Sequence, residues 1–265
     1  MRRALQAFLA IAVLLIGAPA IASVHGGGGS FVGDAAFKTY GAYGIYNAAF
    51  RAGAMGYSRG PDYWDATHYT PGNLQSGVTI TSQWPSNPNG CMGSICGFNA
   101  LDYGHYDDTV VASPITARQI SGITTLQLAL TETFGGTAAG YDHIVDVFTT
   151  MAANDNSNNL HELEIMLHCA PGFCQTFANA TTVGTFTDSF GNAWILKHSG
   201  TINIAYLASF PDWTSGSIDI LQIFQHFVSA GLMANTEWFN GCAIGIEPFR
   251  DDASVTLTSV AFTYN

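Results

Sequence analysis

Short runs in which apolar and polar residues alternate recur along this chain, and turn-forming residues separate them at regular intervals. Successive side chains of a β-strand point to opposite faces, so each run can bury one face and expose the other. The pattern therefore predicts an all-β sandwich. The predicted strands cover residues 77–84, 124–131, 143–148, 160–167, 181–187, 193–198, 201–209, 242–247 and 254–265.

The run ELEIMLH, residues 162–168, shows the alternation most clearly. Its leucines and isoleucine belong to one face of the strand. Glu162, Glu164, Met166 and His168 are expected to share the other face. A half-solvated outer face would explain these polar residues without any function. A second carboxylate in a comparable setting would instead favour a reactive site.

One segment, residues 217–231, has the periodicity of a helix rather than a strand. Ser217 is its expected N-cap and Gly231 its C-terminal stop. We expect its apolar face to pack on the outside of a sheet, and we assign no chemistry to Asp219 or His226. That face comprises Ile220, Ile223, Phe224, Phe227 and Val228.

Residues 1–23 have the organisation of a secretory signal peptide. Two arginines precede an apolar run, and small residues then lead to a cleavage motif, AIA, at residues 20–22. A membrane anchor is the alternative, but the apolar run is short for a span. We expect residues 24–30 to be a glycine-rich lead-in, residues 31–265 to form one domain, and the mature protein to be secreted.

The acidic balance of the chain restricts its partners. The formal net charge is −11, and it becomes −13 without the two N-terminal arginines, since six Lys and Arg then remain against nineteen Asp and Glu. Nucleic acids and anionic membranes are bound through basic surfaces, so neither is an expected partner. A neutral partner fits better. The eight histidines show no metal-ligand spacing, and we expect neither a metal nor another cofactor.

The cysteines form two pairs with the same four-residue gap and one residue left over. In an exported protein the simplest account is two small disulfide-closed loops and a free, buried thiol. A zinc site built from four cysteines is the competing interpretation. The pairs are Cys91 with Cys96 and Cys169 with Cys174, and the remaining thiol is Cys242.

Glu247 provides the second carboxylate. In the run 242–247 it shares a face with two small residues, which leave room beside it. Glu164 and Glu247 are thus both charged groups at strand positions flanked by small or apolar residues, an unusual setting unless the face lines a cleft. Paired carboxylates suit glycosidic bond cleavage, in which one attacks or stabilises the anomeric carbon and the other protonates the leaving oxygen.

Two strings carry a resemblance to glycoside hydrolase family 12. LEIMLHC at residues 163–169 resembles that family's nucleophile strand, close to YEIMIWL, and GIEPF at residues 245–249 resembles its acid/base motif, close to GTEPF or GFEPW. Glu164 and Glu247 are 83 residues apart, the usual interval in the family. Glu162 could take the nucleophile's register, but only Glu164 directly precedes Ile-Met, as in the family.

Other segments extend the resemblance over residues 84–265. VDVF at residues 145–148 resembles the YDIF strand, whose aspartate lies beside the nucleophile, and this implies Asp146 as a third carboxylate. WPSNPNGCMGSIC at residues 84–96 resembles a stretch of bacterial members that contains a small disulfide loop. The expected helix and the TEWFNG string after it also have counterparts.

The sequence departs from the family pattern at several positions. His168 stands where the family has tryptophan, and Val145 replaces the tyrosine ahead of the aspartate. Asn47 and Phe50 are the nearest match to an asparagine-x-x-tryptophan motif that places a sugar-stacking indole. Trp64 and Trp194 are further stacking candidates, each equally suited to a core. The expected substrate-binding residues are Met166, His168, Glu162, Asn47, Phe50, Trp84, Phe148 and Trp238.

The resemblance implies a β-jelly roll of two antiparallel sheets with one helix on the convex side. It further implies a retaining endo-β-1,4-glucanase acting on cellulose-like glucan, mixed-linkage β-glucan or xyloglucan. A monomer is the default expectation. Glu164 would be the nucleophile, Glu247 the acid/base and Asp146 the partner of Glu164, with the carboxyl groups of Glu164 and Glu247 about 5 to 5.5 Å apart. A non-catalytic β-glucan-binding module and a glucan transglycosylase are the alternatives.

Overall fold

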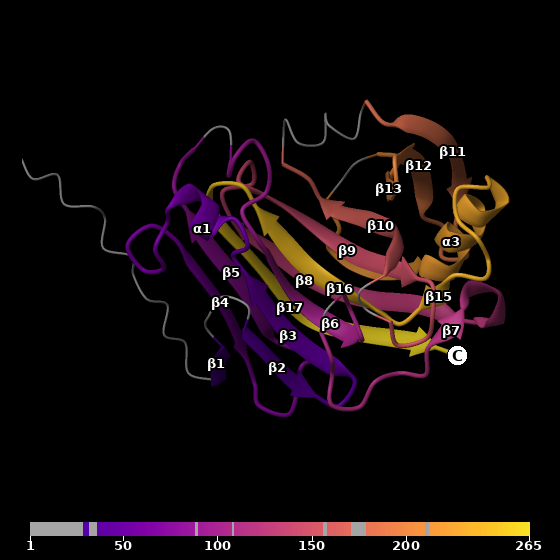
Figure 1. The fold of residues 1–265 in the computed structure, drawn as a ribbon, viewed down its shortest axis with the longest axis horizontal. Coiled ribbons are helices and arrows are strands. Elements are labelled where there is room, and N and C mark those ends of the chain that lie inside the picture. Colours follow the sequence, from indigo (N-terminus) through magenta and orange to yellow (C-terminus); the bar gives the residue numbers. More distant parts are fainter. Residues whose placement is uncertain are drawn as a thin grey trace, which may run out of the picture.

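The computed structural model describes residues 29–31, 36–87, 90–107, 109–155, 158–170, 179–209 and 212–265. It consists of two β-sheets packed face to face (Figure 1), as the alternating runs predict. The predicted signal peptide, residues 1–23, lies outside the described residues. In the described part of the chain, no helix is long and apolar enough to cross a membrane.

The smaller sheet contains six strands in the described part of the chain, in the order β1-β4-β5-β17-β8-β14. Every neighbouring pair in it is antiparallel. The strands are β1 (Gly29–Phe31), β4 (Trp64–Tyr69), β5 (Val78–Trp84), β8 (Leu126–Gly136), β14 (Ser215–Asp219) and β17 (Asp251–Tyr264).

The larger sheet follows the order β11-β12-β13-β10-β9-β16-β6-β3-β2, and β15 joins β7 to the end of β9. Its described pairs are antiparallel except β10 with β13, which corrects the expectation of purely antiparallel sheets. Two strands intervene in sequence between β10 and β13, so β13 returns in the direction of β10. The strands are β2 (Ala36–Tyr40), β3 (Tyr43–Ala48), β6 (Phe98–Gly104), β7 (Arg118–Gln119), β9 (Tyr141–Thr150), β10 (Asn159–His168), β11 (Thr181–Thr187), β12 (Ala193–Ser199), β13 (Ile202–Leu207), β15 (Trp238–Phe239) and β16 (Gly241–Pro248).

The main hydrophobic core lies between the sheets and contains one face of each alternating run. Leu163 and Ile165 of β10 are fully buried there, opposite residues such as Leu128 of β8. Burial of each such side chain stabilises the fold by about 1.5–3 kcal/mol. The burial of this face leaves the alternate residues of β9, β10 and β16 on the outer side of the larger sheet.

Helix α3 (Ile220–Ser229) buries the predicted apolar residues except Val228, and Leu221 joins them. It begins at Asp219 rather than at Ser217, because residues 215–219 pair with β8 as β14. The Asp219 carboxylate caps it by accepting from the Gln222 N–H at 3.2 Å. Gly231 follows its end with a left-handed φ of 72°. The short helix α1 (Ala52–Met55) lies at the opposite end of the molecule (Figure 1). A single 3₁₀ turn, η1, covers Ile120–Gly122.

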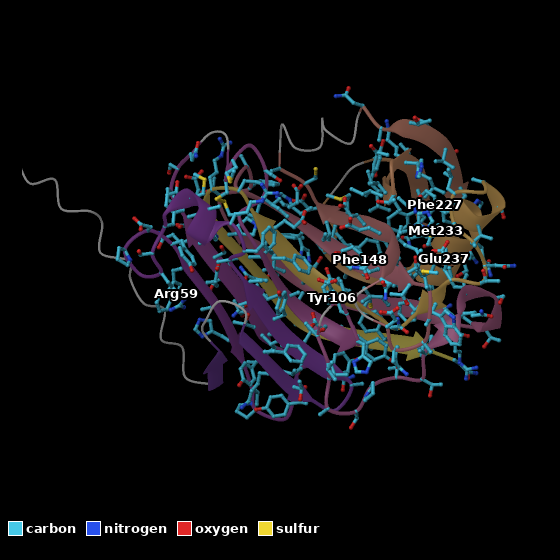
Figure 2. The ribbon with its side chains drawn as sticks, viewed as in Figure 1. Arg59, Tyr106, Phe148, Phe227, Met233 and Glu237 are labelled. Atoms are coloured by element: carbon cyan, nitrogen blue, oxygen red, sulfur yellow. A yellow bond between two sulfur atoms is a disulfide. The ribbon has the colours of Figure 1, made fainter. Side chains whose placement is uncertain are left out.

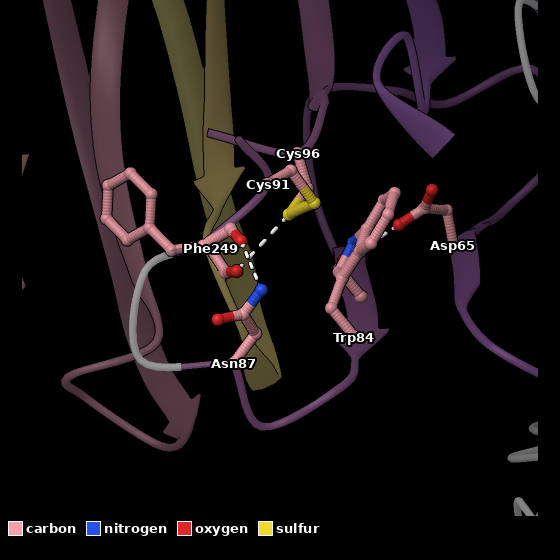
Figure 3. The surroundings of a disulfide bond; sticks show 8 residues. Asp65, Trp84, Asn87, Cys91, Cys96 and Phe249 are labelled. Atoms are coloured by element: carbon pink, nitrogen blue, oxygen red, sulfur yellow. Dashed lines mark hydrogen bonds between the residues drawn. A yellow bond between two sulfur atoms is a disulfide. The ribbon is translucent and has the colours of Figure 1, made fainter. Parts of the chain in front are cut away.

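A disulfide bond joins Cys91 to Cys96, which excludes a zinc site on these two residues (Figure 3). The Cys96 N–H donates to the Pro248 carbonyl at 2.6 Å, and Cys96 Sγ lies 3.2 Å from the Phe249 carbonyl oxygen. The closed loop therefore holds the end of β16.

The other cysteines are only partly described. Cys169 is disulfide-bonded, whereas Cys174, its expected partner, lies outside the described residues. Cys242 is a free, buried thiol, as expected.

A buried polar pair connects the two sheets. Glu132 of β8 and His143 of β9 have almost no exposed surface, and His143 Nε2 lies 2.8 Å from Glu132 Oε2. The other ring nitrogen of His143 lies 2.7 Å from the Gly245 carbonyl oxygen on β16. Oxygen atoms of β8 and β16 thus hold the ring from both sides.

We predict that His143→Ala lowers the free energy of unfolding by about 3–5 kcal/mol, because it leaves the Glu132 carboxylate buried without its partner. Urea denaturation measures the change. Thr131→Val, at an exposed neighbouring position of β8, is the control and should change stability by about 0.5 kcal/mol or less. A loss below about 1 kcal/mol in His143→Ala would show that the pair does not stabilise the sandwich.

Candidate active site

Six carboxylate residues lie on the outer side of the larger sheet, and we call this surface the carboxylate face. Strand β9 runs between the two predicted catalytic strands: Asp146 pairs with Glu164 of β10, and Asp142 pairs with Glu247 of β16. Directly paired residues of neighbouring strands share a face. The sixth is Asp102 of β6, which pairs with Ala243, the partner of Asp146 on β16. The six residues are Asp102, Asp142, Asp146, Glu162, Glu164 and Glu247.

A small apolar floor separates the two ends of this group. Ile144 and Met166 pair with each other between β9 and β10, and Gly245 of β16 pairs with Ile144 on the other side. A Cβ at Gly245 would meet the Asn99 carbonyl oxygen at 2.6 Å and Ala100 Cβ at 2.8 Å, so only glycine fits there. Glu164 and Glu247 therefore lie on either side of a low, apolar strip.

Asp146 is held by a residue that the sequence pattern did not indicate. The Tyr106 hydroxyl donates to Asp146 Oδ2, and both side chains are buried. The Tyr106 ring also packs 5.6 Å from the ring of Phe148 (Figure 2). Asp146 Oδ1 and Glu164 Oε2 are buried with no hydrogen-bond partner among the described residues. These two oxygens are free to contact each other or a substrate.

Burial of these acids favours their protonated forms. It is the main cause that raises the pKa of Glu164 well above its ordinary value, and the charge of Glu247 raises it further. The pKa of Glu247 is raised in the same way, first by removal from water and then by the charges of Asp142 and Asp146. The effect of the Glu247 charge on Glu164 indicates that the two carboxyl groups lie within electrostatic reach of each other.

Asp146, Asp142 and Glu162 behave similarly. Burial and the charge of Glu162 raise the pKa of Asp146 well above its ordinary value, although the Tyr106 hydrogen bond lowers it. Burial raises the pKa of Asp142 to about 8. Burial, with the charge of Asp107, raises that of Glu162 to about 7.

His168 does not share a face with Glu164 in this structure. A β-bulge shifts the register between Met166 and His168, so that His168 pairs with His143 on the core side. Its ring lies 4.8 Å from Tyr141, and its nitrogens bond to Asp212 and to the Ala138 carbonyl. The expectation of a sugar contact at His168 is therefore corrected to a position in the inter-sheet packing.

Asn47 and Trp84 also lie away from the carboxylate face. Asn47 is fully buried between the sheets and accepts a hydrogen bond from Thr67 of β4 at 2.9 Å. Trp84 is 3% exposed and stacks on Tyr63 at 4.5 Å. Both were expected to bind sugar, but the parity of β3 turns Asn47 inward and the disulfide loop region covers Trp84.

Two further tryptophans are accounted for by packing. Trp194 is fully buried and donates from Nε1 to Asp188 at 2.9 Å. Trp64 lies under the guanidinium of Arg59, whose Cζ is 4.1 Å from the ring centroid. Neither side chain is free to stack on a sugar.

The remaining expected contacts keep suitable positions. Met166 and Phe148 belong to the apolar cluster of the carboxylate face, and Glu162 pairs with Phe148. Trp238 pairs with Thr150, on the same side of β9 as Phe148, and is half-buried. Phe50 is 55% exposed in the loop between β3 and α1.

Asp142 and Tyr106 are functional candidates that the sequence analysis missed. The sequence could have indicated Asp142, because every second residue of a strand shares a face and Asp142 falls in register with Ile144, Asp146 and Phe148 in the run YDHIVDVF. Tyr106 lies in an irregular segment after β6, where no periodicity indicates which way a side chain points. Among the described residues, no group of three His, Cys, Asp or Glu side chains could hold a metal ion.

Comparisons with known proteins bear on the fold. No protein-family model matches the chain, and no curated protein matches it by sequence. Solved structures do match. The family GH12 endoglucanase 3 of Trichoderma harzianum is 16% identical with a TM-score of 0.71, covering 89% of this chain and 97% of that chain. Endoglucanase cel12A of Rhodothermus marinus is 14% identical with a TM-score of 0.71, covering 89% and 98%.

A family 12 xyloglucanase of Bacillus licheniformis is 14% identical with a TM-score of 0.69, covering 89% of this chain and all of that chain. These likenesses show that the chain has the β-jelly roll fold of the glycoside hydrolase family 12 enzymes, as the two sequence strings implied.

The raised pKa values predict that the folded protein loses stability as pH rises. Each acid binds its proton more tightly folded than unfolded, so the folded state is favoured below about pH 4 and progressively less up to about pH 8. Thermal melting between pH 4 and pH 9 measures this. Asp142→Asn should flatten the upper part of the curve, and a melting temperature that rises from pH 5 to pH 8 would contradict the assignment.

Proposed function

We propose that this protein is a family 12 glycoside hydrolase, a retaining endo-β-1,4-glucanase that hydrolyses internal bonds of a neutral β-glucan. The supporting observation is the arrangement of Glu164 and Glu247 on one face, on either side of β9 and an apolar floor, each within the string that carries its role in the family. The family 12 fold raises the prior for this function, although a fold alone does not fix an activity.

In this proposal Glu164 is the nucleophile. Its ionised carboxylate attacks the anomeric carbon while Glu247 gives its proton to the leaving oxygen, and a glucosyl-enzyme forms. Glu247, now ionised, then takes a proton from water, which displaces Glu164 and retains the anomeric configuration. The raised pKa of Glu247 keeps a proton available for the first step.

Asp146 would hold the nucleophile in place. It pairs with Glu164, and the Tyr106 hydroxyl fixes its Oδ2 while Oδ1 has no partner among the described residues. A protonated Asp146 can donate from Oδ1 to Glu164 and stabilise the ionised nucleophile, since burial raises the pKa of Asp146. Tyr106 thereby acts on Glu164 through Asp146.

The site also favours a particular class of substrate. The nucleophile Glu164 reacts as a carboxylate and would repel an anionic polymer, whereas a neutral glucan brings no charge to this face. Met166 and Phe148 offer apolar contact beside the reacting sugar, and Trp238 and Phe50 are the proposed outer platforms. We propose a secreted monomer that needs no cofactor.

A glucan-binding module is the competing class of function. Such a module would need aromatic platforms, but it gains nothing from burying Glu164, Asp146 and Asp142, because a buried carboxyl group costs stability. Retention of these groups on one face is explained by catalysis. A transglycosylase would share the same covalent intermediate and differ only in its acceptor.

We predict that the protein releases reducing sugar from xyloglucan, barley β-glucan or carboxymethylcellulose, with the anionic polymer the poorest of the three. Glu164→Gln and Glu247→Gln should each lower the rate by about 10³-fold or more, because each removes an essential group. Glu237→Gln is the matched control, since Glu237 bonds to Thr149 and His161 away from the site. A wild type that binds these polymers without cutting any of them would favour the binding module.

Azide rescue distinguishes the two roles. The small anion can replace the missing carboxylate in Glu164→Ala and give an α-glycosyl azide from an activated aryl β-glycoside. In Glu247→Ala it should attack the glycosyl-enzyme and give the β-glycosyl azide. The product configuration is read by NMR, and the reverse assignment of the two products would exchange the roles of Glu164 and Glu247.

A further inference from the structure

Asp142 lies directly opposite Glu247 in the antiparallel pair of β9 and β16. Residues so placed have Cβ atoms about 4.5–5.5 Å apart, so their carboxyl groups are neighbours. Ile144 separates Asp142 from Asp146 on the same face of β9. Asp142 therefore stands beside Glu247 as Asp146 stands beside Glu164.

The two oxygens of Asp142 have different surroundings. Oδ1 accepts a hydrogen bond from the Ala170 N–H at 2.5 Å. Oδ2 has no hydrogen-bond partner among the described residues, and it is shielded from water because only 1% of the Asp142 surface is exposed. A buried carboxyl oxygen without a partner is costly, so its retention calls for an explanation beyond the contact with Ala170.

The charge state of Asp142 suits a donor. Burial raises its pKa to about 8, so Asp142 holds a proton at neutral pH and Oδ2 can donate it in a hydrogen bond. The titratable groups that act on Glu247 are Asp142 and Asp146 of β9 and Glu162 and Glu164 of β10. Of these, Asp142 alone is its direct strand neighbour.

We propose, on the basis of the glycosidase function above, that Asp142 is a positioning residue for Glu247, whose protonated Oδ2 donates a hydrogen bond to the Glu247 carboxylate formed after proton transfer. Glu247 gives its proton to the glycosidic oxygen as the bond from that oxygen to the anomeric carbon breaks and Glu164 bonds to the carbon. The ionised Glu247 then accepts the hydrogen bond from Asp142. In the second half-reaction Glu247 takes a proton from water, and Asp142 keeps its own proton throughout.

The leaving group of the substrate tests this role. A phenyl β-cellotrioside needs protonation by Glu247, whereas a 2,4-dinitrophenyl β-cellotrioside leaves as a stable anion without it. Asp142→Leu removes the donor, so kcat/KM for the phenyl glycoside should fall by about 10²-fold while that for the dinitrophenyl glycoside changes by about threefold or less. Asp142→Asn keeps a donor and an acceptor and should leave kcat/KM for both substrates within about fivefold of wild type.

Three outcomes would overturn the proposal. An equal loss on both glycosides in Asp142→Leu would mean that the residue only packs the sheet. No loss on either would mean that Glu247 needs no neighbour. A loss in Asp142→Asn as large as in Asp142→Leu on the phenyl glycoside would exclude the donor role. If Asp142→Leu does not fold, Asp142→Val is measured in its place on the same two glycosides, with the same expected results.

Glu247→Gln separates this inference from the proposed function. If the wild type cleaves both glycosides and Glu247→Gln loses only the phenyl glycoside, the acid assignment holds and the Asp142 variants decide the inference alone. If Glu247→Gln shows no dependence on the leaving group, the acid assignment itself is wrong, and so is the role of Asp142.

Discussion

The pairing of β9 with β10 on one side and with β16 on the other is the constraint on which the candidate site depends. One strand sets the positions of two carboxyl pairs, Asp146 with Glu164 and Asp142 with Glu247. The pleat turns these residues outward and turns Val145 and Val147 into the core. A shift of one residue in either pairing would exchange the two faces, so the burial of the valines also fixes the site.

The hydrophobic core offsets the stability that the buried acids of the site cost when they ionise. Five acids with raised pKa values favour the folded state only while they hold protons, and each ionisation at higher pH costs stability. The sandwich compensates with two sheets that bury apolar residues along most of their length and with a polar pair, Glu132 and His143, between them. Active sites whose buried groups cost stability are commonly supported by a rigid scaffold.

Much of this arrangement could be predicted from sequence because it depends on period-two alternation. The strand from 181 to 187 was predicted with its exact bounds, and the faces of Glu164 and Glu247 followed from their neighbours. His168 was misplaced because a bulge changes the parity of a strand without leaving a mark in its composition. Tyr106 could not have been assigned, since only the folded loop brings its hydroxyl to Asp146.

The disulfide between Cys91 and Cys96 touches the chain where β16 ends, next to Glu247. Cys169, which directly follows the nucleophile strand β10, is disulfide-bonded as well. Sheet pairing places both Glu164 and Glu247, but each of their strands ends beside a bond that forms only when thiols are oxidised. A chain in a reducing environment would therefore pair its strands while their ends stay loosely held, and oxidation would be the last step of its assembly.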